Sequence, residues 1–260
     1  MKKIMLAFFA LVITAQVFCA PPDFTLSAGG GLTGISHWKQ AELKDVYKDY
    51  TGDVLYSGLI KAPTEPTQDA MRQGLFDTDE NVNGFGFHGF FDATYVEVNA
   101  AFLWTWIDQT VHIPEDPVFN LAGSETYNHM VTQMYFSIFG KYPFKIGKSK
   151  WSISPMVGAA YQLALAEPDK KFYDSLKLVK AKGYDVPNLG ELLNSWWIKF
   201  GVGADYNITG KLFLRSELLY GLKLPNEYEI GMADYWTENI KGMSNGLTYS
   251  LAVGYKIKTF

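Results

Sequence analysis

Cysteine is almost absent from this chain of 260 residues, because Cys19 is the only one. A single thiol cannot form a disulfide within the chain, so other interactions must hold the fold. Metal-ligand clusters, phosphate-binding glycine loops and the GxSxG elbow of serine hydrolases are missing as well. The spacing of the histidines gives no set of nucleophile, base and orienting residue. The sequence therefore predicts no metal, no cofactor and no enzymatic activity.

Basic patches are also missing. The net charge is −4, and it becomes −6 once the first 19 residues and their two lysines are removed. Nucleic acid is therefore excluded as an expected partner. After residue 19, no apolar run approaches the roughly 20 residues that a membrane-spanning helix needs. We expect the mature chain to have no helical membrane anchor.

The N-terminus has the features of a secretory signal peptide. Two lysines precede an apolar run over residues 4–13, which is too short to span a membrane. We expect cleavage after Cys19, so that residues 1–19 form the signal peptide and residues 20–260 form a single domain. Lipid modification of Cys19 is the alternative, although residues 16–18 match the lipid-attachment motif poorly.

What the chain does contain is aromatic residues, at 16%, and long stretches of alternating side chains. The clearest stretch is 196–221, WWIKFGVGADYNITGKLFLRSELLYG, which predicts two strands and a tight turn at 207–210. One face carries bulky apolar side chains, and the other carries glycine and charged side chains. This alternation is typical of strands that separate two different environments.

The same alternation predicts eight strands in all. Long connections (35–83, 107–126, 166–195 and 222–245) alternate with short ones, and helix candidates lie near 38–50 and 168–182 in two of the long ones. This rhythm is typical of an up-and-down barrel. We predict an all-β fold, an eight-stranded antiparallel up-and-down transmembrane β-barrel with four long extracellular loops, some short helices in them, and short periplasmic turns. The expected strands are 24–34, 84–91, 94–106, 127–142, 151–165, 196–206, 212–220 and 246–257.

Two secreted barrels fit eight such strands, a soluble lipocalin-like one with its apolar face inside and a membrane barrel with its apolar face outside. The interior of an eight-stranded barrel is only wide enough for side chains to fill it. Rows of Phe, Trp, Tyr, Leu and Ile exceed that volume, whereas the opposite face is rich in Gly, Ser, Ala and Thr. The apolar rows also contain no charged residue, as lipid requires. These observations favour the membrane barrel.

Aromatic residues on the apolar face concentrate at the two ends of the strands. Membrane barrels carry such aromatic belts where lipid meets water. The predicted belts consist of Tyr142, Trp151, Tyr206 and Tyr255 at the tight-turn end, and of Trp104, Trp106, Tyr161, Trp196 and Tyr220 at the other.

The face predicted to line the interior carries a set of polar side chains. Pairing Tyr206 with Leu212 places Arg215 opposite Gly203 and Glu217 opposite Gly201, with Lys199 diagonal to Glu217 and within ion-pair reach. A turn at Asp92-Ala93 places His88 opposite Glu97. Buried charges must pair or stay hydrated. The interior is either a packed polar core or a narrow channel with a gate. The candidate lumen residues are Arg215, Glu217, Lys199, Asp205, Glu97, His88 and Gln133.

The strands resemble the small eight-stranded outer-membrane proteins of diderm bacteria, of the OmpA membrane-domain, OmpX and OmpW types. The residues that carry the resemblance lie in 200–206, 212–215 and 251–257. Phe260 resembles the C-terminal signal that the barrel-assembly machinery recognises. Counting back from Phe260 in steps of two gives Lys258 and Lys256 instead of apolar residues. Either a bulge shifts the alternation or the last residues fray. The resemblance implies location in the bacterial outer membrane.

Two functions fit these observations. The first is a surface protein whose long extracellular loops serve a structural, interaction or adhesin-like role. The second is a narrow passive channel for small or hydrophobic solutes, as the resemblance to OmpW implies. The expected partners are the lipid bilayer of the outer membrane, the barrel-assembly machinery through the C-terminal strand, and host or envelope ligands at the loops.

Overall fold

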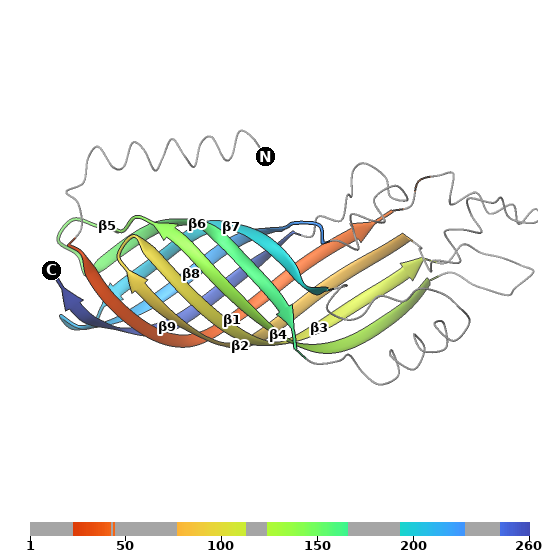
Figure 1. The fold of residues 1–260 in the computed structure, drawn as a ribbon, viewed down its shortest axis with the longest axis horizontal. Helices are drawn as coiled ribbons and strands as arrows, with labels where there is room; N and C mark the ends of the chain where they lie inside the picture. The colour runs from red at the N-terminus through yellow and green to blue at the C-terminus, as the bar shows by residue number, and fades with distance from the viewer. Residues whose placement is uncertain (1–22, 43, 45–76, 113–123, 166–192, 227–244) are drawn as a thin grey trace, which may run out of the picture.

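The structure is a computed structural model that describes residues 23–42, 44, 77–112, 124–165, 193–226 and 245–260 (Figure 1). The predicted signal peptide, Cys19 and the helix candidate at 168–182 lie outside the described residues.

The described residues form nine antiparallel strands, which pair in sequence order except where β5 is bypassed. β4 pairs directly with β6, and β1 pairs with β9, so the sheet closes into an eight-stranded barrel to which the two-residue β5 adds a short extra strand. The predicted eight-stranded up-and-down barrel is therefore confirmed. The strands are β1 (Thr25–Ala41), β2 (Asp77–Ala93), β3 (Val96–His112), β4 (Ser124–Lys141), β5 (Phe144–Lys145), β6 (Trp151–Ala164), β7 (Ser195–Asn207), β8 (Leu212–Lys223) and β9 (Asn245–Thr259).

The strands are staggered as they go round the barrel. A path through directly paired residues starts at Ala28 on β1 and returns to β1 at Trp38, ten residues further along. A stagger of this size over eight strands tilts each strand by roughly 40° to the barrel axis. The bore is then narrow enough to be filled by side chains. The path runs through Phe91, Val98, Ile138, Ala159, Ile198, Leu222 and Asn245.

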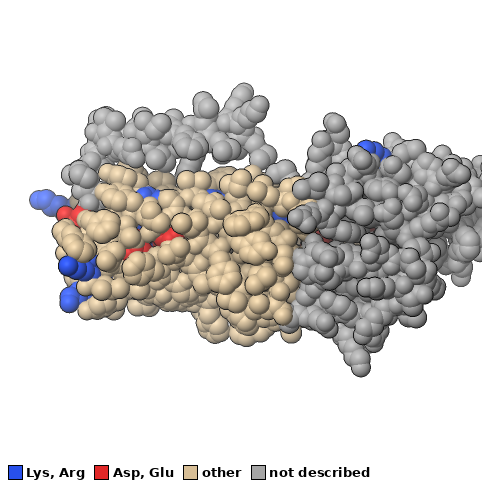
Figure 2. Space-filling model, in the orientation of Figure 1, with Lys and Arg blue, Asp and Glu red and all other residues tan. Residues whose placement is uncertain are grey.

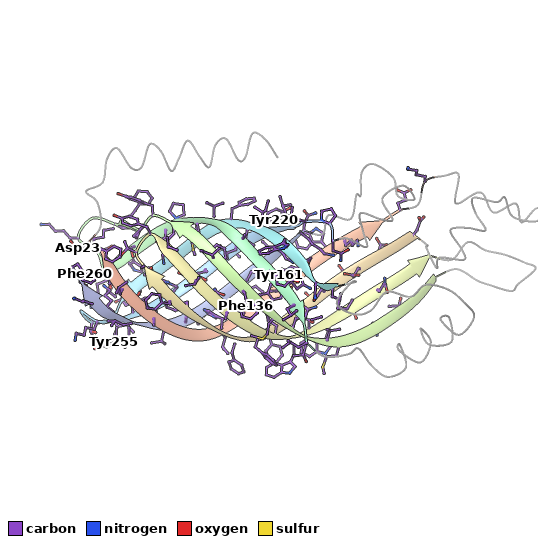
Figure 3. The ribbon with its side chains drawn as sticks, in the orientation of Figure 1. Asp23, Phe136, Tyr161, Tyr220, Tyr255 and Phe260 are labelled. Carbon is purple, nitrogen blue, oxygen red and sulfur yellow. The ribbon has the colours of Figure 1, made fainter. Side chains whose placement is uncertain are left out.

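Connection lengths divide the barrel into two unlike ends. At the tight-turn end, the strands are joined by two to five residues, whereas at the long-connection end they are separated by 35, 11, 30 and 21 residues. Both Asp23 and Phe260 lie at the tight-turn end, together with Tyr255, and Tyr161 and Tyr220 lie towards the other end (Figure 3).

The predicted assignment of faces holds along the strands. Side chains of the apolar rows point outwards, and Phe87, Leu218 and Leu251 keep 56%, 52% and 58% of their surface exposed. The broad side of the barrel is predominantly uncharged (Figure 2). The alternate side chains, which include Glu97 and Arg215, are buried in the interior. This is the inside-out arrangement of a barrel that is solvated by lipid.

Several strands are longer than predicted. β1 continues to Ala41 and β2 begins at Asp77, so the expected loop at 35–83 and the start of the helix candidate at 38–50 were wrong over these residues. β3 continues to His112 and β4 begins at Ser124, so the expected loop at 107–126 was wrong at both of its ends. The physical reason is a change of environment. Beyond Trp106, the outward residues of β3 become Asp108 and Thr110, so the apolar alternation ends while strand pairing continues.

The end of β9 contains a β-bulge. The pairing of β1 with β9 shifts between Leu26 and Ser27, because β9 carries one extra residue between Lys256 and Lys258. The shift turns Phe260 onto the outer face, where its ring lies 5.6 Å from that of Phe24. Of the two predicted explanations for the broken alternation, the bulge is the one that the structure contains.

Two glycines on β2 test how closely the wall is packed. A Cβ on Gly86 would collide with the carbonyl oxygen of Phe102 on β3, whereas a Cβ on Gly89 would meet nothing closer than 3.8 Å. We expect Gly86→Ala to lower the free energy of unfolding by about 1–3 kcal/mol, since overpacking forces the backbone to shift. Gly89→Ala on the same strand should change it by less than about 0.5 kcal/mol. Urea unfolding of the detergent-folded protein measures both, and equal effects would contradict the close approach.

Candidate functional site in the barrel interior

A cavity of about 460 Å³ opens at the tight-turn end of the barrel. Its mouth is lined by side chains of the turns and strand ends, among them Asp23, Lys145 and Lys256. Its lining also includes the charged side chains of Asp92, Lys141, Asp205 and Arg215, which are buried or half-buried. The cavity therefore leads from solvent to a group of ion pairs in the interior.

Arg215 is the centre of these ion pairs. Its Nη1 donates to Glu97 Oε2 at 2.6 Å, and its Nη2 donates to Asp92 Oδ2 at 2.6 Å. Asp205 accepts two further hydrogen bonds, from Nε to Oδ1 at 2.7 Å and from Nη2 to Oδ2 at 2.9 Å. The planar guanidinium is suited to such a bidentate contact, so one side chain joins three carboxylates.

Lys141 completes what we call the ionic network: Asp92, Glu97, Lys141, Asp205 and Arg215. The Nζ of Lys141 lies 2.5 Å from Asp92 Oδ2 and 2.8 Å from Glu97 Oε2. Each of these two carboxylates thus touches both cations. Because burial makes an unpaired charge costly, the mutual pairing is what allows five charged groups inside the barrel.

The β2–β3 hairpin positions the two shared carboxylates. Its turn is formed by Thr94 and Tyr95, and Thr94 has a left-handed φ of 59°. The Thr94 hydroxyl accepts a hydrogen bond from Thr25 N at 2.6 Å and lies 3.0 Å from Thr25 O, which holds the turn against β1. With the turn at this place, Asp92 lies directly opposite Glu97.

Aromatic rings enclose the guanidinium. Arg215 lies over the rings of Phe90 and Phe213, with its central carbon 4.5 Å and 5.1 Å from their centroids. The faces of aromatic rings attract cations, more strongly when water is excluded. The two rings therefore orient Arg215 towards its carboxylate partners.

Glu217 and Lys199 lie outside the ionic network. Glu217 accepts a hydrogen bond from Ser250 Oγ at 2.9 Å. Lys199 donates to Thr248 Oγ1 at 2.9 Å, and its Nζ lies 4.8 Å from the centroid of the Tyr135 ring. Neither residue forms an ion pair within the described part of the chain.

Large side chains close the interior further along the barrel. Phe139, Met156 and Leu219 form one buried cluster, and a larger cluster follows. In the larger cluster, Trp197 donates through Nε1 to Gln162 Oε1 at 2.7 Å, and its ring centroid lies 4.2 Å from that of His37. The larger cluster consists of Ile35, Val82, Ala101, Leu103, Ile107, Val131, Tyr135, Ala160 and Trp197.

The structure brings together only some of the predicted lumen residues. Arg215, Asp205 and Glu97 meet in the ionic network, and Glu217 and His88 are buried without joining it. Gln133 contacts the hydroxyl of Tyr135 at 3.3 Å.

Two predicted cross-strand contacts were wrong. Tyr206 pairs with Leu214 rather than Leu212, because the turn between β7 and β8 lies at 208–211. Arg215 therefore faces Asp205 and Glu217 faces Gly203, and the expected ion pair between Lys199 and Glu217 does not form.

The turn between β2 and β3 was misplaced as well. His88 faces Ala101 instead of Glu97, because the turn lies at Thr94-Tyr95 and not at Asp92-Ala93. A shift by an even number of residues keeps every side chain on its face. The face was therefore right where the partner was wrong.

Sequence reasoning missed two members of the ionic network, Asp92 and Lys141. Asp92 was placed in the turn, and Lys141 was not among the candidate lumen residues. A two-residue turn after Ala93 would have brought Asp92 opposite Glu97, and two adjacent buried carboxylates need a cation from a neighbouring strand. Lys141, on β4 beside β3, is that cation.

Within the described ranges, no three or more His, Cys, Asp or Glu side chains are grouped so that they could hold a metal ion. No helix in that same part of the chain is both long and apolar enough to cross a membrane.

Comparisons with known proteins give structural likenesses only. No protein-family model matches the chain, and no curated protein matches it either. Solved structures of outer-membrane proteins do match. The chain is similar to OprG from Pseudomonas aeruginosa, with 12% identity, a TM-score of 0.46, and coverage of 92% of this chain and 98% of that one. The likeness to E. coli outer membrane protein W has 11% identity, a TM-score of 0.36, and coverage of 90% and 98%. The likeness to Ail of Yersinia pestis has 12% identity, a TM-score of 0.35, and coverage of 90% of this chain and 99% of that one.

The ionic network makes Arg215 the most sensitive position of the interior. Arg215→Met would leave Asp92, Glu97 and Asp205 short of a cation in a buried site. We expect the free energy of unfolding to fall by about 3–5 kcal/mol, as when one partner of a buried ion pair is removed. Lys211→Met, at an exposed position, should change it by less than about 0.5 kcal/mol. Urea unfolding followed by tryptophan fluorescence compares the two, and a loss below 1 kcal/mol at Arg215 would argue against a tightly paired network.

Proposed function

We propose that this protein is an outer-membrane β-barrel of a diderm bacterium that serves as a surface protein. In this proposal the barrel is a closed scaffold, and the long connections at one end carry the interactions with structural, host or envelope partners. The observation that carries the proposal is an outer wall that is apolar and uncharged over its middle, around an interior that side chains close beyond the cavity at the tight-turn end.

The outer wall supports the membrane location. Trp151 pairs with Tyr206 and Tyr161 pairs with Trp196, and the ring centroids of each pair lie 4.9 Å and 5.0 Å apart. The two pairs are ten residues apart on each strand. At about 3.3 Å per residue and a tilt of roughly 40°, the distance along the axis is about 25 Å. Apolar bands of membrane barrels have this height, with aromatic rings at both edges.

The remaining aromatic rings support the same two edges of the apolar band. Tyr142 and Tyr255 lie at the edge near the tight turns, and Tyr220, Trp104 and Trp106 lie towards the long connections. Phe85 stacks on Trp106 with 5.5 Å between ring centroids, at the point where the outward residues of β3 turn polar. We interpret these rings as the two interfacial belts.

Strand lengths support a functional surface at the long-connection end. β1 to β4 continue beyond the rings, and their outward residues there include Asn81, Asp108 and Asn128. Polar outward residues are suited to water rather than to lipid. The wall on this side therefore projects into solvent and supports the long connections of 35 and 11 residues.

Two further expectations belong to this proposal. Residues 1–19 act as a signal peptide for export, and the barrel-assembly machinery recognises β9. The outward ring of Phe260, which the bulge places against Phe24, is compatible with such recognition.

A narrow channel is the second candidate, and the cavity of about 460 Å³ at the tight-turn end favours it. A solute in this cavity would meet the ionic network, and beyond it the buried rings of Phe139 and Trp197. Passage would require these side chains to move. We therefore favour the closed scaffold.

A charge on the outer wall tests the membrane location. Leu251 lies midway between the two levels of rings and is 58% exposed. We expect Leu251→Arg to cost about 2–4 kcal/mol of stability in lipid bilayers, whereas Gly210→Arg in a tight turn, where a side chain meets nothing within 4 Å, should cost about 0–1 kcal/mol. Reversible folding into vesicles measures both. Equal tolerance of the two changes would contradict a lipid-facing wall.

Conductance separates the two candidate functions. A closed scaffold should give no current steps in planar bilayers and no swelling of liposomes that contain small solutes. Replacing residues 46–75 with a short Gly-Ser linker should leave the folded, heat-modifiable form intact and abolish the adhesion of bacteria that display the protein. Reproducible current steps from the wild type, together with adhesion that survives the replacement, would favour the channel.

A further inference from the structure

We propose that Lys150, Lys211 and Lys258 form a surface that binds the phosphate groups of anionic phospholipids at the tight-turn end of the barrel. We call these three residues the lysine arc. The inference rests on the proposed function in one respect, because it requires the outer wall to be embedded in a bilayer.

Each lysine of the arc lies over an outward aromatic ring. Lys150 Nζ is 5.9 Å from the centroid of Tyr206, Lys211 Nζ is 5.8 Å from that of Tyr255, and Lys258 Nζ is 4.3 Å from that of Phe260. The same arrangement thus occurs three times at one edge of the apolar band. Such contacts hold a lysine against the wall instead of leaving it extended into water.

The depth of these rings points to lipid headgroups. Aromatic side chains at the edge of a membrane barrel lie where hydrocarbon meets water. An ammonium group held over such a ring is therefore at the level of the lipid phosphates. Lysines near an anionic membrane surface each contribute attraction on the order of 1 kcal/mol.

The position of the arc is asymmetric. Lys150 precedes β6, Lys211 precedes β8 and Lys258 lies on β9, so the arc covers the side of the wall formed by β6 to β9. On the β1 to β4 side of the same end, the described residues include Lys141 as their only lysine, and it is buried in the ionic network. The attraction for anions is thus confined to one side.

Other lysines at this end have different surroundings. Lys145 forms an ion pair with Asp23 at 3.5 Å, Lys256 contacts Asn207 Oδ1 at 2.5 Å, and both line the cavity together with Lys148. Together the lysines make this end of the barrel basic (Figure 2), although no basic patch was predicted from the sequence. Only the lysines of the arc are seated on outward rings among the described residues, so only they face a bilayer that surrounds the wall.

Spin-labelled lipids test the inference directly. The folded protein is placed in bilayers of phosphatidylcholine, and trace amounts of spin-labelled phosphatidylglycerol or phosphatidylcholine report how much of each is immobilised on the wall. We expect phosphatidylglycerol to be preferred about threefold, since a few lysines near the surface suffice for this. The preference should vanish at high salt, because salt screens exposed charges.

Two matched double variants test which lysines cause the preference for phosphatidylglycerol. Lys211→Gln/Lys258→Gln, which leaves only Lys150 of the arc, should lower it by more than half towards unity, whereas Lys145→Gln/Lys148→Gln, which removes the same charge from the same end, should retain most of it. Heat modifiability on gels first establishes that both variants are folded. Equal losses in the two variants, or no preference in the wild type, would overturn the lysine arc.

Two further measurements distinguish a failure of the lysine arc from a failure of the proposed function. Millimolar glycerophosphoglycerol, the headgroup without acyl chains, should leave the preference unchanged, and its disappearance would mean that the surface takes free phosphate esters instead of lipid. Immobilisation of neither lipid would mean that the wall is not embedded, which contradicts the proposed function itself. Immobilisation of both lipids without preference contradicts the lysine arc alone.

Discussion

The narrow bore of the barrel is the constraint on which the rest of the structure depends. Eight strands with a stagger of ten residues enclose a space so narrow that side chains close it beyond the cavity at the tight-turn end. Rows of large apolar side chains cannot fit there, so they cover the outside, and glycine, small polar residues and a few charged ones remain within. The apolar exterior then needs lipid, and a closed barrel meets the second demand of lipid, which is that every backbone polar group in the wall has a partner.

The members of the ionic network pair with one another in this bore, whereas Glu217 and Lys199 bond to hydroxyl groups. The pairing within the network distinguishes between registers. Sliding β8 past β7 by two residues keeps every apolar side chain outside, but it moves Arg215 from Asp205 to Gly203. The observed register gives Arg215 its bidentate partner, and the observed turn at Thr94-Tyr95 brings Asp92 opposite Glu97 within reach of Lys141. Buried ion pairs are weak sources of net stability, yet losing one partner is costly. We infer that the ionic network selects the register more than it strengthens the fold.

The apolar rows determine the faces and the ionic network determines the register, and this difference explains which features could be predicted from the sequence. Alternation with a period of two defines the faces, the number of strands and the closed barrel, because each apolar row is long. Register is different, since shifts of two or four residues leave the alternation unchanged, and therefore the partners of His88, Glu217 and Lys199 were wrong. Strand ends beyond Trp106 were also missed, because outward residues in water lose the apolar signal while pairing continues. A single extra residue in β9 broke the alternation and concealed the outward position of Phe260.

The two ends of the barrel differ in a way that bears on orientation. At the tight-turn end, the described outward charges are lysines seated on rings, whereas the outward residues of β2 and β3 beyond the rings at the other end include Asp79 and Asp108. Lipid phosphates attract the first and repel the second. The short turns add little surface for a partner, and the extended wall of β1 to β4 adds much. An interior closed by Phe139 and Trp197 supports the proposal that this protein makes its contacts outside the bore, with lipid along the wall and with partners at the long connections.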